Sequence, residues 1–256
     1  MTEKDQRGWR AAVAALTVRQ AAGLALGVGF LLFWFGGLWS YMVWGGPPER
    51  TAWAAPFFLL LAAVAALAGA GGREAWRLAL AGLIGFAAEL AGTRTGFPFG
   101  GYRYTEALGP QVGSVPLVLA CAWVVVFAHA RQVVRIVPRA VARLLLTAAW
   151  LVGLDLVIDP LAAGPLDYWS WTETGFWHGV PWTNFAGWAF VGLVLAATAP
   201  AAAPPRPWTR RVGLGVLLFF TILAAAHRLH YATLAGTVLV AVDLLLGRTA
   251  RTSPAP

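Results

Sequence analysis

The chain has 256 residues, of which 59% are hydrophobic and only 12% charged, and it has a formal net charge of +8. Soluble domains usually have about a quarter of charged residues, so this composition excludes an ordinary soluble enzyme. The single cysteine, Cys121, excludes an intramolecular disulfide and a CxxC redox pair, and the single lysine, Lys4, lies in the N-terminal tail and excludes a transmembrane retinal Schiff base.

Eight apolar stretches approach the length of about 20 residues that a helix needs to cross the hydrocarbon layer. The sequence therefore predicts an all-α, polytopic bundle of about eight transmembrane helices with aromatic-rich outer loops. The expected spans are 21–44, 52–71, 76–92, 115–130, 140–160, 183–199, 212–227 and 231–246. Only three residues separate the last two stretches, so a count of seven spans, with these two merged, stays open.

The basic residues test the number of spans, because lysine and arginine concentrate on the cytoplasmic side of a membrane protein. With eight spans and a cytoplasmic N-terminus, all but four of the 19 basic residues fall in inner segments. The four on the outer side are Arg50, Arg94, Arg103 and Arg228. This distribution predicts a multi-pass protein of the cell (inner) membrane with both termini in the cytoplasm. It also assigns the basic charge to topology and to contact with anionic lipids rather than to nucleic acid.

We expect three parts along the chain. Residues 1–20 form a basic cytoplasmic or interfacial segment that includes Trp9, residues 21–247 form a single transmembrane catalytic domain, and residues 248–256 form a cytoplasmic tail. The first apolar segment is too long for a signal peptide and lacks a small-residue cleavage site, so we expect it to be retained as a helix.

Four acidic residues fall within the expected spans. A carboxylate at membrane depth costs a few kcal/mol, so such residues are usually paired, protonated or functional. Asp243 lies near the inner end of the last span, where pairing with Arg248 or snorkelling to the interface would explain it. Glu89, Asp155 and Asp159 lie towards the outer ends of the third and fifth spans and are candidate catalytic residues.

Asp155 and Asp159 are four residues apart, which places both on one face of a helix that Pro160 ends or kinks. Two carboxyl groups one turn apart in a dry site resist ionising together, so one is expected to keep its proton while the other is charged. The protonated carboxyl group can then act as an acid, and the ionised one can stabilise a positive charge. The structural alternative is that each aspartate caps a neighbouring helix or pairs with an outer arginine.

Aromatic, glycine and proline residues crowd two outer loops, over 93–104 and 166–185, on the same side as these three acids. An interfacial aromatic belt would account for some of the rings. Five of the 14 tryptophans nevertheless gather in one loop and the start of the next span, which favours a folded lid or re-entrant segment. They are Trp169, Trp171, Trp177, Trp182 and Trp188.

A weak internal repeat links the two loops. Glu89 precedes Tyr102 by 13 residues, and Asp155 precedes Tyr168 by 13. This spacing suggests two helix–loop–helix units that each present an acid to a shared cavity.

His227 and His230 have the i, i+3 spacing of metal ligands, and with Glu89 and Asp159 they would form a carboxylate–histidine iron site. Only two further histidines exist, so the histidine boxes of membrane desaturases are absent. Nucleotide, dinucleotide and common hydrolase motifs are absent as well. We therefore expect neither a metal nor a cofactor.

The predicted site is an acid-rich, aromatic-lined cavity that opens into lipid. Such a cavity suits proton addition to an alkene of an apolar substrate, with aromatic faces stabilising the carbocation and an ionised partner orienting the water that captures it. Proton loss or ring closure would instead give an isomerase or a cyclase. A binding or transport protein that uses the acids as a proton relay is the third alternative. The residues alone do not choose between hydratase and cyclase.

The acids and the outer loops form a series of short motifs. They are Glu89, Gly92-Thr93, Gly96, Phe99-Gly-Gly-Tyr-Arg-Tyr104, Pro116, Trp123, Asp155, Asp159-Pro160, Trp169-Ser-Trp171 and Gly179-Val-Pro-Trp-Thr-Asn-Phe-Ala-Gly-Trp188. Over about residues 20–247 this series resembles the membrane carotenoid hydratases of bacteria and haloarchaea. The resemblance implies addition of water across the terminal 1,2 double bond of an acyclic ψ-end. The substrate would be a carotenoid within the bilayer, and lipids and other carotenoid-pathway enzymes are candidate partners. It favours the hydratase over the cyclase or isomerase.

The positions of these residues within the membrane spans and outer loops indicate their roles in the site. Asp155 and Asp159 are the expected catalytic acids, and Glu89 is the alternative proton donor. The residues expected to bind substrate or position water are Tyr102, Tyr104, Arg94, Trp169, Trp171, Asn184, Trp188, His227 and His230.

Overall fold

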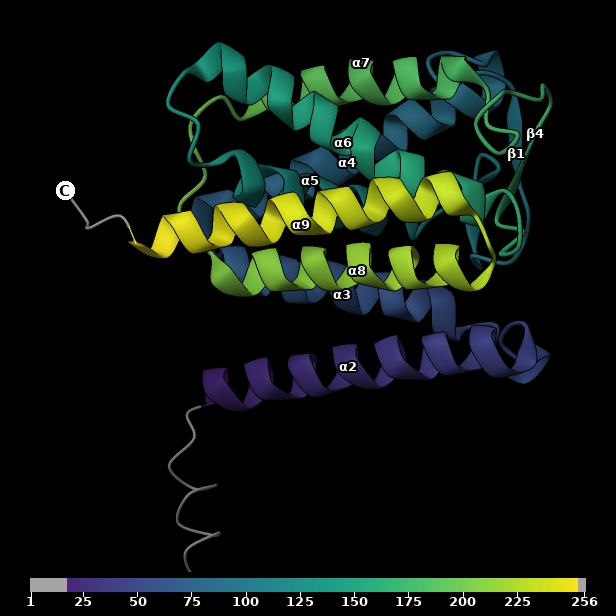
Figure 1. Cartoon of the computed structure of the whole chain (residues 1–256), viewed down its shortest axis with the longest axis horizontal. Helices are drawn as coiled ribbons and strands as arrows, with labels where there is room; N and C mark the ends of the chain where they lie inside the picture. The colour runs from purple at the N-terminus through teal and green to yellow at the C-terminus, as the bar shows by residue number, and fades with distance from the viewer. Residues whose placement is uncertain (1–17, 253–256) are drawn as a thin grey trace, which may run out of the picture.

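The computed structural model describes residues 18–252, which form an all-α bundle with two small β-ribbons (Figure 1). The helices are α2 (Val18–Trp44), α3 (Ala54–Ala70), α4 (Gly72–Thr95), α5 (Leu119–Val134), α6 (Ala140–Ala162), α7 (Trp182–Thr198), α8 (Pro207–Ala226) and α9 (His230–Thr252), with a 3-10 turn at Glu49–Thr51. The predicted all-α class is confirmed. The expected interfacial segment with Trp9 and the last four residues of the tail lie outside the described residues.

Five of the described helices are long and apolar enough to cross a membrane, which is the fold of a membrane protein. They cover Gln20–Trp44, Gly72–Thr95, Ala140–Ala162, Pro207–Ala226 and His230–Arg248. The apolar helices α3, α5 and α7 have only 16 or 17 residues. At 1.5 Å per residue they reach about 25 Å, somewhat less than the hydrocarbon thickness of about 30 Å. Helices α8 and α9 are separate, joined by a turn in which Arg228 has a φ of 59°.

Helix α5 begins later than predicted, at Leu119 instead of 115, because the preceding residues form a hairpin. Strand β2 (Gln111–Val112) pairs antiparallel with β3 (Val115–Pro116). The turn between them is Gly113 and Ser114, with φ values of 59° and 66°. Two successive positive φ values are typical of a two-residue hairpin turn.

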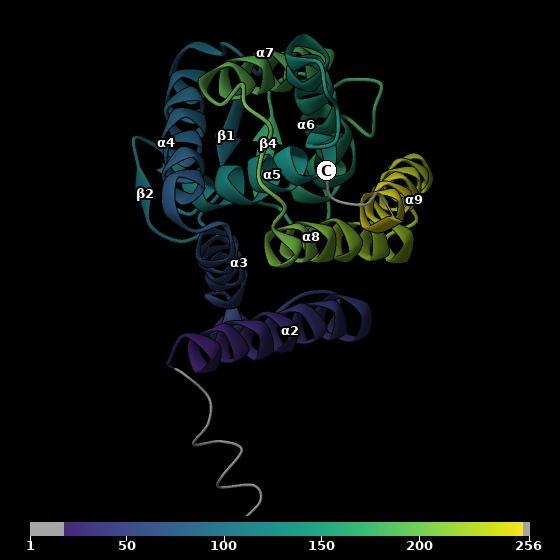
Figure 2. The same cartoon turned by 90° about the vertical axis from the view of Figure 1, so that its left-hand side faces the viewer.

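Helix α5 is the centre of the bundle. In the end-on view of Figure 2, α4, α6 and α7 lie above it, α3, α8 and α9 lie below or beside it, and α2 lies at the far edge. Every residue of α5 from Trp123 to Val134 is buried. Helix α2 packs on α3 and α8 and exposes large apolar side chains such as Leu32, Phe35 and Trp39, as expected for contact with lipid.

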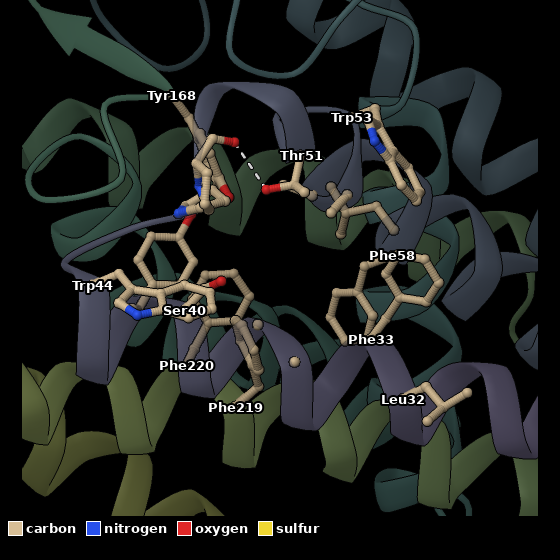
Figure 3. A pocket seen from close by; sticks show the side chains of 18 residues that line it. Leu32, Phe33, Ser40, Trp44, Thr51, Trp53, Phe58, Tyr168, Phe219 and Phe220 are labelled. Carbon is tan, nitrogen blue, oxygen red and sulfur yellow. Dashed lines mark hydrogen bonds between the residues drawn. The ribbon is translucent and has the colours of Figure 1, made fainter.

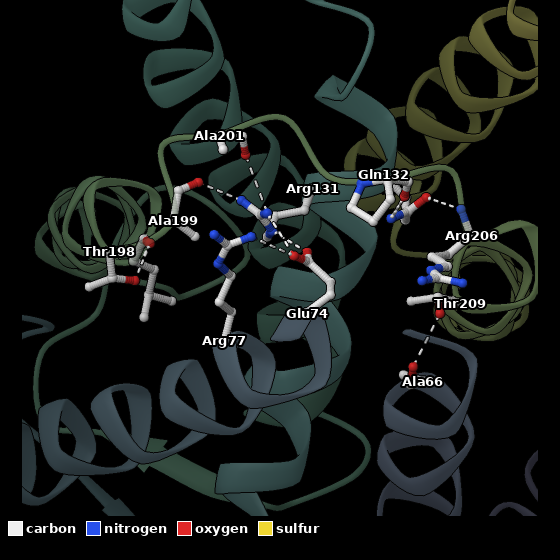
Figure 4. A network of polar contacts seen from close by, with 12 residues as sticks. Ala66, Glu74, Arg77, Arg131, Gln132, Thr198, Ala199, Ala201, Arg206 and Thr209 are labelled. Atoms are coloured by element: carbon white, nitrogen blue, oxygen red, sulfur yellow. Dashed lines mark hydrogen bonds and ion pairs between the residues drawn. The ribbon is translucent and has the colours of Figure 1, made fainter. Parts of the chain in front are cut away.

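Polar side chains at the C-terminal end of α5 bind the elements around it (Figure 4). Arg131 donates through Nε to Glu74 of α4 at 2.7 Å and through Nη1 to the carbonyl of Ala199 at 2.6 Å. The side-chain oxygen of Gln132 accepts the backbone N–H of Arg206 at 2.9 Å. These contacts fasten α4 and the loop between α7 and α8 to the central helix.

Asp243 of α9 is paired differently from the prediction. Its Oδ1 accepts a hydrogen bond from Arg210 Nε at 3.0 Å and lies 3.2 Å from His129 Nε2. Arg248 is exposed and is not its partner. The prediction was wrong because residues five apart do not share a helix face, and Asp243 faces the bundle.

The Arg131–Glu74 pair gives a test of the packing around α5. Both side chains are about 5% exposed or less, and a buried charge that loses its partner costs about 3 kcal/mol or more. We expect Glu74→Gln to lower the free energy of unfolding by about 3 kcal/mol, measured by chemical unfolding in detergent micelles. Arg77→Gln is the matched control, because Arg77 also contacts Glu74, at 3.3 Å, but is 32% exposed. Exposed pairs contribute about 1 kcal/mol or less, so equal losses in the two variants would contradict this assignment.

Candidate functional site

The candidate site lies at the end of the bundle that carries the β1–β4 ribbon, on the right in Figure 1. Strand β1 (Tyr102–Tyr104) follows α4, and β4 (Trp169–Trp171) follows α6. The strands pair antiparallel, with Tyr102 opposite Trp171 and Tyr104 opposite Trp169. Alternate residues of a strand share a face, so the two tyrosines and two tryptophans point to the bundle while the residues between them are exposed.

Glu89 of α4 is the first acid that this ribbon contacts. It is buried, and its Oε2 accepts hydrogen bonds from the hydroxyls of Tyr102 at 2.5 Å and Tyr104 at 2.8 Å. Its Oε1 accepts a hydrogen bond from Nε1 of Trp123 in α5 at 3.1 Å. Both carboxyl oxygens therefore have neutral donors, as a buried polar group requires.

The two tyrosines keep their protons. Burial, and next the charge of the adjacent Glu89, raises the pKa of Tyr102 and Tyr104 above the ordinary value of about 10. Both hydroxyls are therefore protonated at physiological pH and remain hydrogen-bond donors to Glu89.

Asp155 and Asp159 of α6 form the second acidic centre. Asp159 Oδ1 accepts hydrogen bonds from the indole N–H groups of Trp169 at 2.7 Å and Trp171 at 3.3 Å. Asn184, in the first turn of α7, donates through Nδ2 to Asp155 at 2.6 Å and to Asp159 at 2.5 Å. One amide thus bridges two carboxyl groups that lie on one face of α6, as their four-residue spacing predicts.

A cavity of about 70 Å³ lies between these two centres. Glu89 lines it from α4 and Asp159 lines it from α6, whereas the internal repeat placed Asp155 beside Glu89 in the shared cavity. The aromatic walls include Trp123 and Trp188, which stack with ring centroids 4.5 Å apart. A polar cavity holds a water once it offers about 10–15 Å³, so this one has room for water beside the acids.

Most of the predicted site residues meet in this cavity. Its lining includes Glu89, Asp159, Tyr102, Tyr104, Trp169, Trp171, Asn184 and Trp188. Asp155 does not line it and lies behind Asn184, 1% exposed.

Three predicted residues lie elsewhere. Arg94 is exposed at the last turn of α4, five residues after Glu89 and so on a different face. His227 and His230 lie at the turn between α8 and α9, outside the cavity lining. Within residues 18–252, no group of three or more His, Cys, Asp or Glu side chains is placed to hold a metal ion.

The internal repeat does not extend to the contacts of its two tyrosines, because Tyr102 contacts Glu89 but Tyr168 does not contact Asp155. Tyr168 does not face the acids, and its hydroxyl lies 3.3 Å from the hydroxyl of Tyr41 in α2. The residues that correspond to Tyr102 and Tyr104 are Trp169 and Trp171, because these are the positions of β4 that point to the bundle.

Trp123 is a site residue that the role assignment missed. The signal for it was present, since an indole N–H buried in an apolar helix needs an acceptor. Room for it comes from Gly85, where a Cβ atom would overlap the Trp123 ring. Gly92 acts in the same way, because a Cβ atom there would lie 2.6 Å from the hydroxyl of Tyr102. The two glycines flank Glu89 on one face of α4 at i−4 and i+3.

Comparisons with known proteins identify the family of this chain. The family described as "Carotenoid biosynthesis protein" matches residues 53–248. A "Bisanhydrobacterioruberin hydratase" of Haloarcula japonica is 36% identical over 118 residues, which cover 44% of this chain and 40% of that protein. The chain therefore aligns with less than half of that relative, and no solved structure matches it. The family match includes both acidic centres and the β1–β4 ribbon, and it spans well over half of the sequence. The chain belongs to the carotenoid biosynthesis protein family.

Proposed function

We propose that the protein is a membrane-embedded carotenoid hydratase that adds water across the terminal 1,2 double bond of an acyclic ψ-end. The observation that carries this proposal is the cavity in which Glu89 of α4 and Asp159 of α6 meet among aromatic rings. The family and the hydratase relative support the substrate class. We place the reaction in the transmembrane domain over residues 21–247, with water as co-substrate.

The Asp155–Asp159 pair is the proton source in this proposal. Two carboxyl groups bridged by the amide of Asn184 repel each other when both are charged, so the pair holds one proton. Asp159 is the member that faces the cavity and is therefore the general acid. Asp155 is a positioning residue that acts through Asn184 and the shared proton. Protonation of C2 of the double bond leaves a tertiary cation at C1.

On the other side of the site, aromatic rings stabilise the carbocation and Glu89 activates the water. The faces of aromatic rings such as Trp123 and Trp188 stabilise a nearby positive charge. Glu89, held by three donors, accepts a proton from the water as the water oxygen bonds to C1. The product carries the added hydrogen at C2 and the hydroxyl at C1, and the proton on Glu89 returns to the aspartate pair through water in the cavity. The reaction is redox-neutral and uses no cofactor.

Expression in a lycopene-producing host tests the activity directly. We expect the pigments to gain the mass of one water molecule for each ψ-end that reacts, measured by mass spectrometry of the extracts. A product of unchanged mass with a shifted absorption spectrum would instead indicate a cyclase or isomerase. Unaltered pigment would contradict catalysis and favour binding or transport.

Amide substitutions test the assigned acids. General acid–base catalysis contributes about 10²- to 10⁴-fold in rate, so we expect Asp159→Asn and Glu89→Gln each to lose about a hundredfold or more. Asp167→Asn is the matched control, because Asp167 is exposed in the same outer loop and its φ of 50° also suits asparagine. Hydration rates are compared at equal amounts of membrane-inserted protein. A loss below about tenfold in Asp159→Asn would remove that residue from the role of donor.

The proposed orientation places both termini in the cytoplasm and the cavity towards the outer leaflet of the cell (inner) membrane. The first residues of α2 and the C-terminal end lie at the same end of the bundle in Figure 1, opposite the β1–β4 ribbon. Exposed arginines such as Arg139, Arg211 and Arg248 lie in the loop and helix ends away from the ribbon. A reporter fused to the C-terminus should be active only in the cytoplasm. If a reporter that works only in the periplasm were active at the C-terminus, the cytoplasmic location of that terminus would be wrong.

A further inference from the structure

The cavity between the acids is too small for a whole carotenoid. Its volume is about 70 Å³, whereas pockets for small-molecule ligands usually have about 300–1,000 Å³. The reacting end of a long isoprenoid would fit there only if the rest of the chain is bound elsewhere. A second cavity, of about 540 Å³, has the size that the first one lacks.

This larger cavity lies between α2, α3 and α8 (Figure 3). Its walls are mainly apolar and include aromatic rings, with Phe33 and Trp44 from α2, Phe58 from α3 and Phe219 from α8. None of the described residues that line it is charged. Such a lining suits a hydrocarbon chain, and it offers no charged partner for the headgroup of a phospholipid.

Tyr168 places the larger cavity next to the acids. Tyr168 lines the larger cavity, and the next residue, Trp169, lines the smaller one and donates a hydrogen bond to Asp159. Leu59 of the larger cavity and Leu119 of the smaller one pack in the same apolar cluster. The two cavities are therefore lined by adjacent residues of one segment and by members of one apolar cluster.

We propose that the larger cavity binds the apolar chain of the substrate, a long linear isoprenoid, while its ψ-end passes beside Tyr168 to the acids. This inference rests on the proposed function. Helix α2 supplies one wall and lies outside the residues that match the family, 53–248. The acids lie within the matched residues, whereas the α2 wall of the larger cavity lies outside them. The hydroxyls of Tyr41 and Tyr168 are 3.3 Å apart. They link the α2 wall to the segment in which Trp169 donates a hydrogen bond to Asp159.

Two glycines of α2 provide a matched test. A Cβ atom added at Gly36 or at Gly23 meets nothing within 4 Å, so both positions accept a side chain. Only Gly36 lines the larger cavity. Leucine favours a helix more than glycine does, so neither Gly36→Leu nor Gly23→Leu is expected to impair folding.

The two variants are compared on two substrates, lycopene and a short isoprenoid hydrocarbon with the same ψ-end. We expect Gly36→Leu to raise KM for lycopene about tenfold, the effect of losing about 1.4 kcal/mol of binding, and to leave the short substrate unchanged. Gly23→Leu should change neither. An unchanged KM for lycopene in Gly36→Leu, or an equal change for both substrates, would overturn the assignment of the cavity.

A binding measurement separates this proposal from the proposed reaction. Wild type, Gly36→Leu and Gly23→Leu are purified from the lycopene-producing host, and the carotenoid and phospholipid bound to each are quantified. We expect pigment to copurify with wild type and Gly23→Leu and to fall about tenfold in Gly36→Leu, even if turnover is absent. Equal amounts of bound pigment in all three proteins would overturn the assignment. A Gly36→Leu protein that loses bound phospholipid and keeps its pigment would overturn it as well. Bound pigment without any hydrated product would contradict the proposed function alone.

Discussion

Three carboxyl groups buried in an apolar bundle need hydrogen-bond donors, and this need determines how the loops at one end of the protein fold. A buried polar group without a partner is costly, so the donors must come from whatever segments reach the acids. For Glu89 they come from β1 and α5, and for Asp159 from β4 and α7. The pairing of β1 with β4 joins the two sets of donors into one layer over both acidic centres.

The buried acids at the two ends of the bundle have different kinds of hydrogen-bond donor. Glu74 is bound by the guanidinium of Arg131, and Asp243 by Arg210 and His129. Each of these acids is paired with an arginine, and the pairs hold helices together. Glu89 and Asp159 instead receive phenol, indole and amide donors, which satisfy their oxygens without adding a fixed positive charge. Carboxyl groups held in this way are better placed to exchange protons with a substrate.

In the proposed function, the two cavities divide the recognition of a long apolar substrate from the chemistry at its end. The smaller one is polar at its acids, aromatic in its walls and sized for water and a terminal group. The larger one is uncharged and faces α2, the helix at the edge of the bundle. In this proposal a change in α2 alters which chain is bound without altering the acids, because α2 lines the larger cavity and not the smaller one.

Local sequence patterns predicted the helices and which residues share a face within each element. Apolar stretches predicted the helices to within a few residues, and the four-residue spacing of Asp155 and Asp159 predicted that they share a face. The aromatic loops were identified as part of the site for the same local reasons. Contacts between distant parts of the chain could not be predicted in this way. Trp123 reaches Glu89 across 34 residues, Tyr168 meets Tyr41 across 127, and Arg210 displaces Arg248 as the partner of Asp243. Periodicity sets directions within one helix or strand, whereas these contacts depend on how helices pack and on which strand residues face inward.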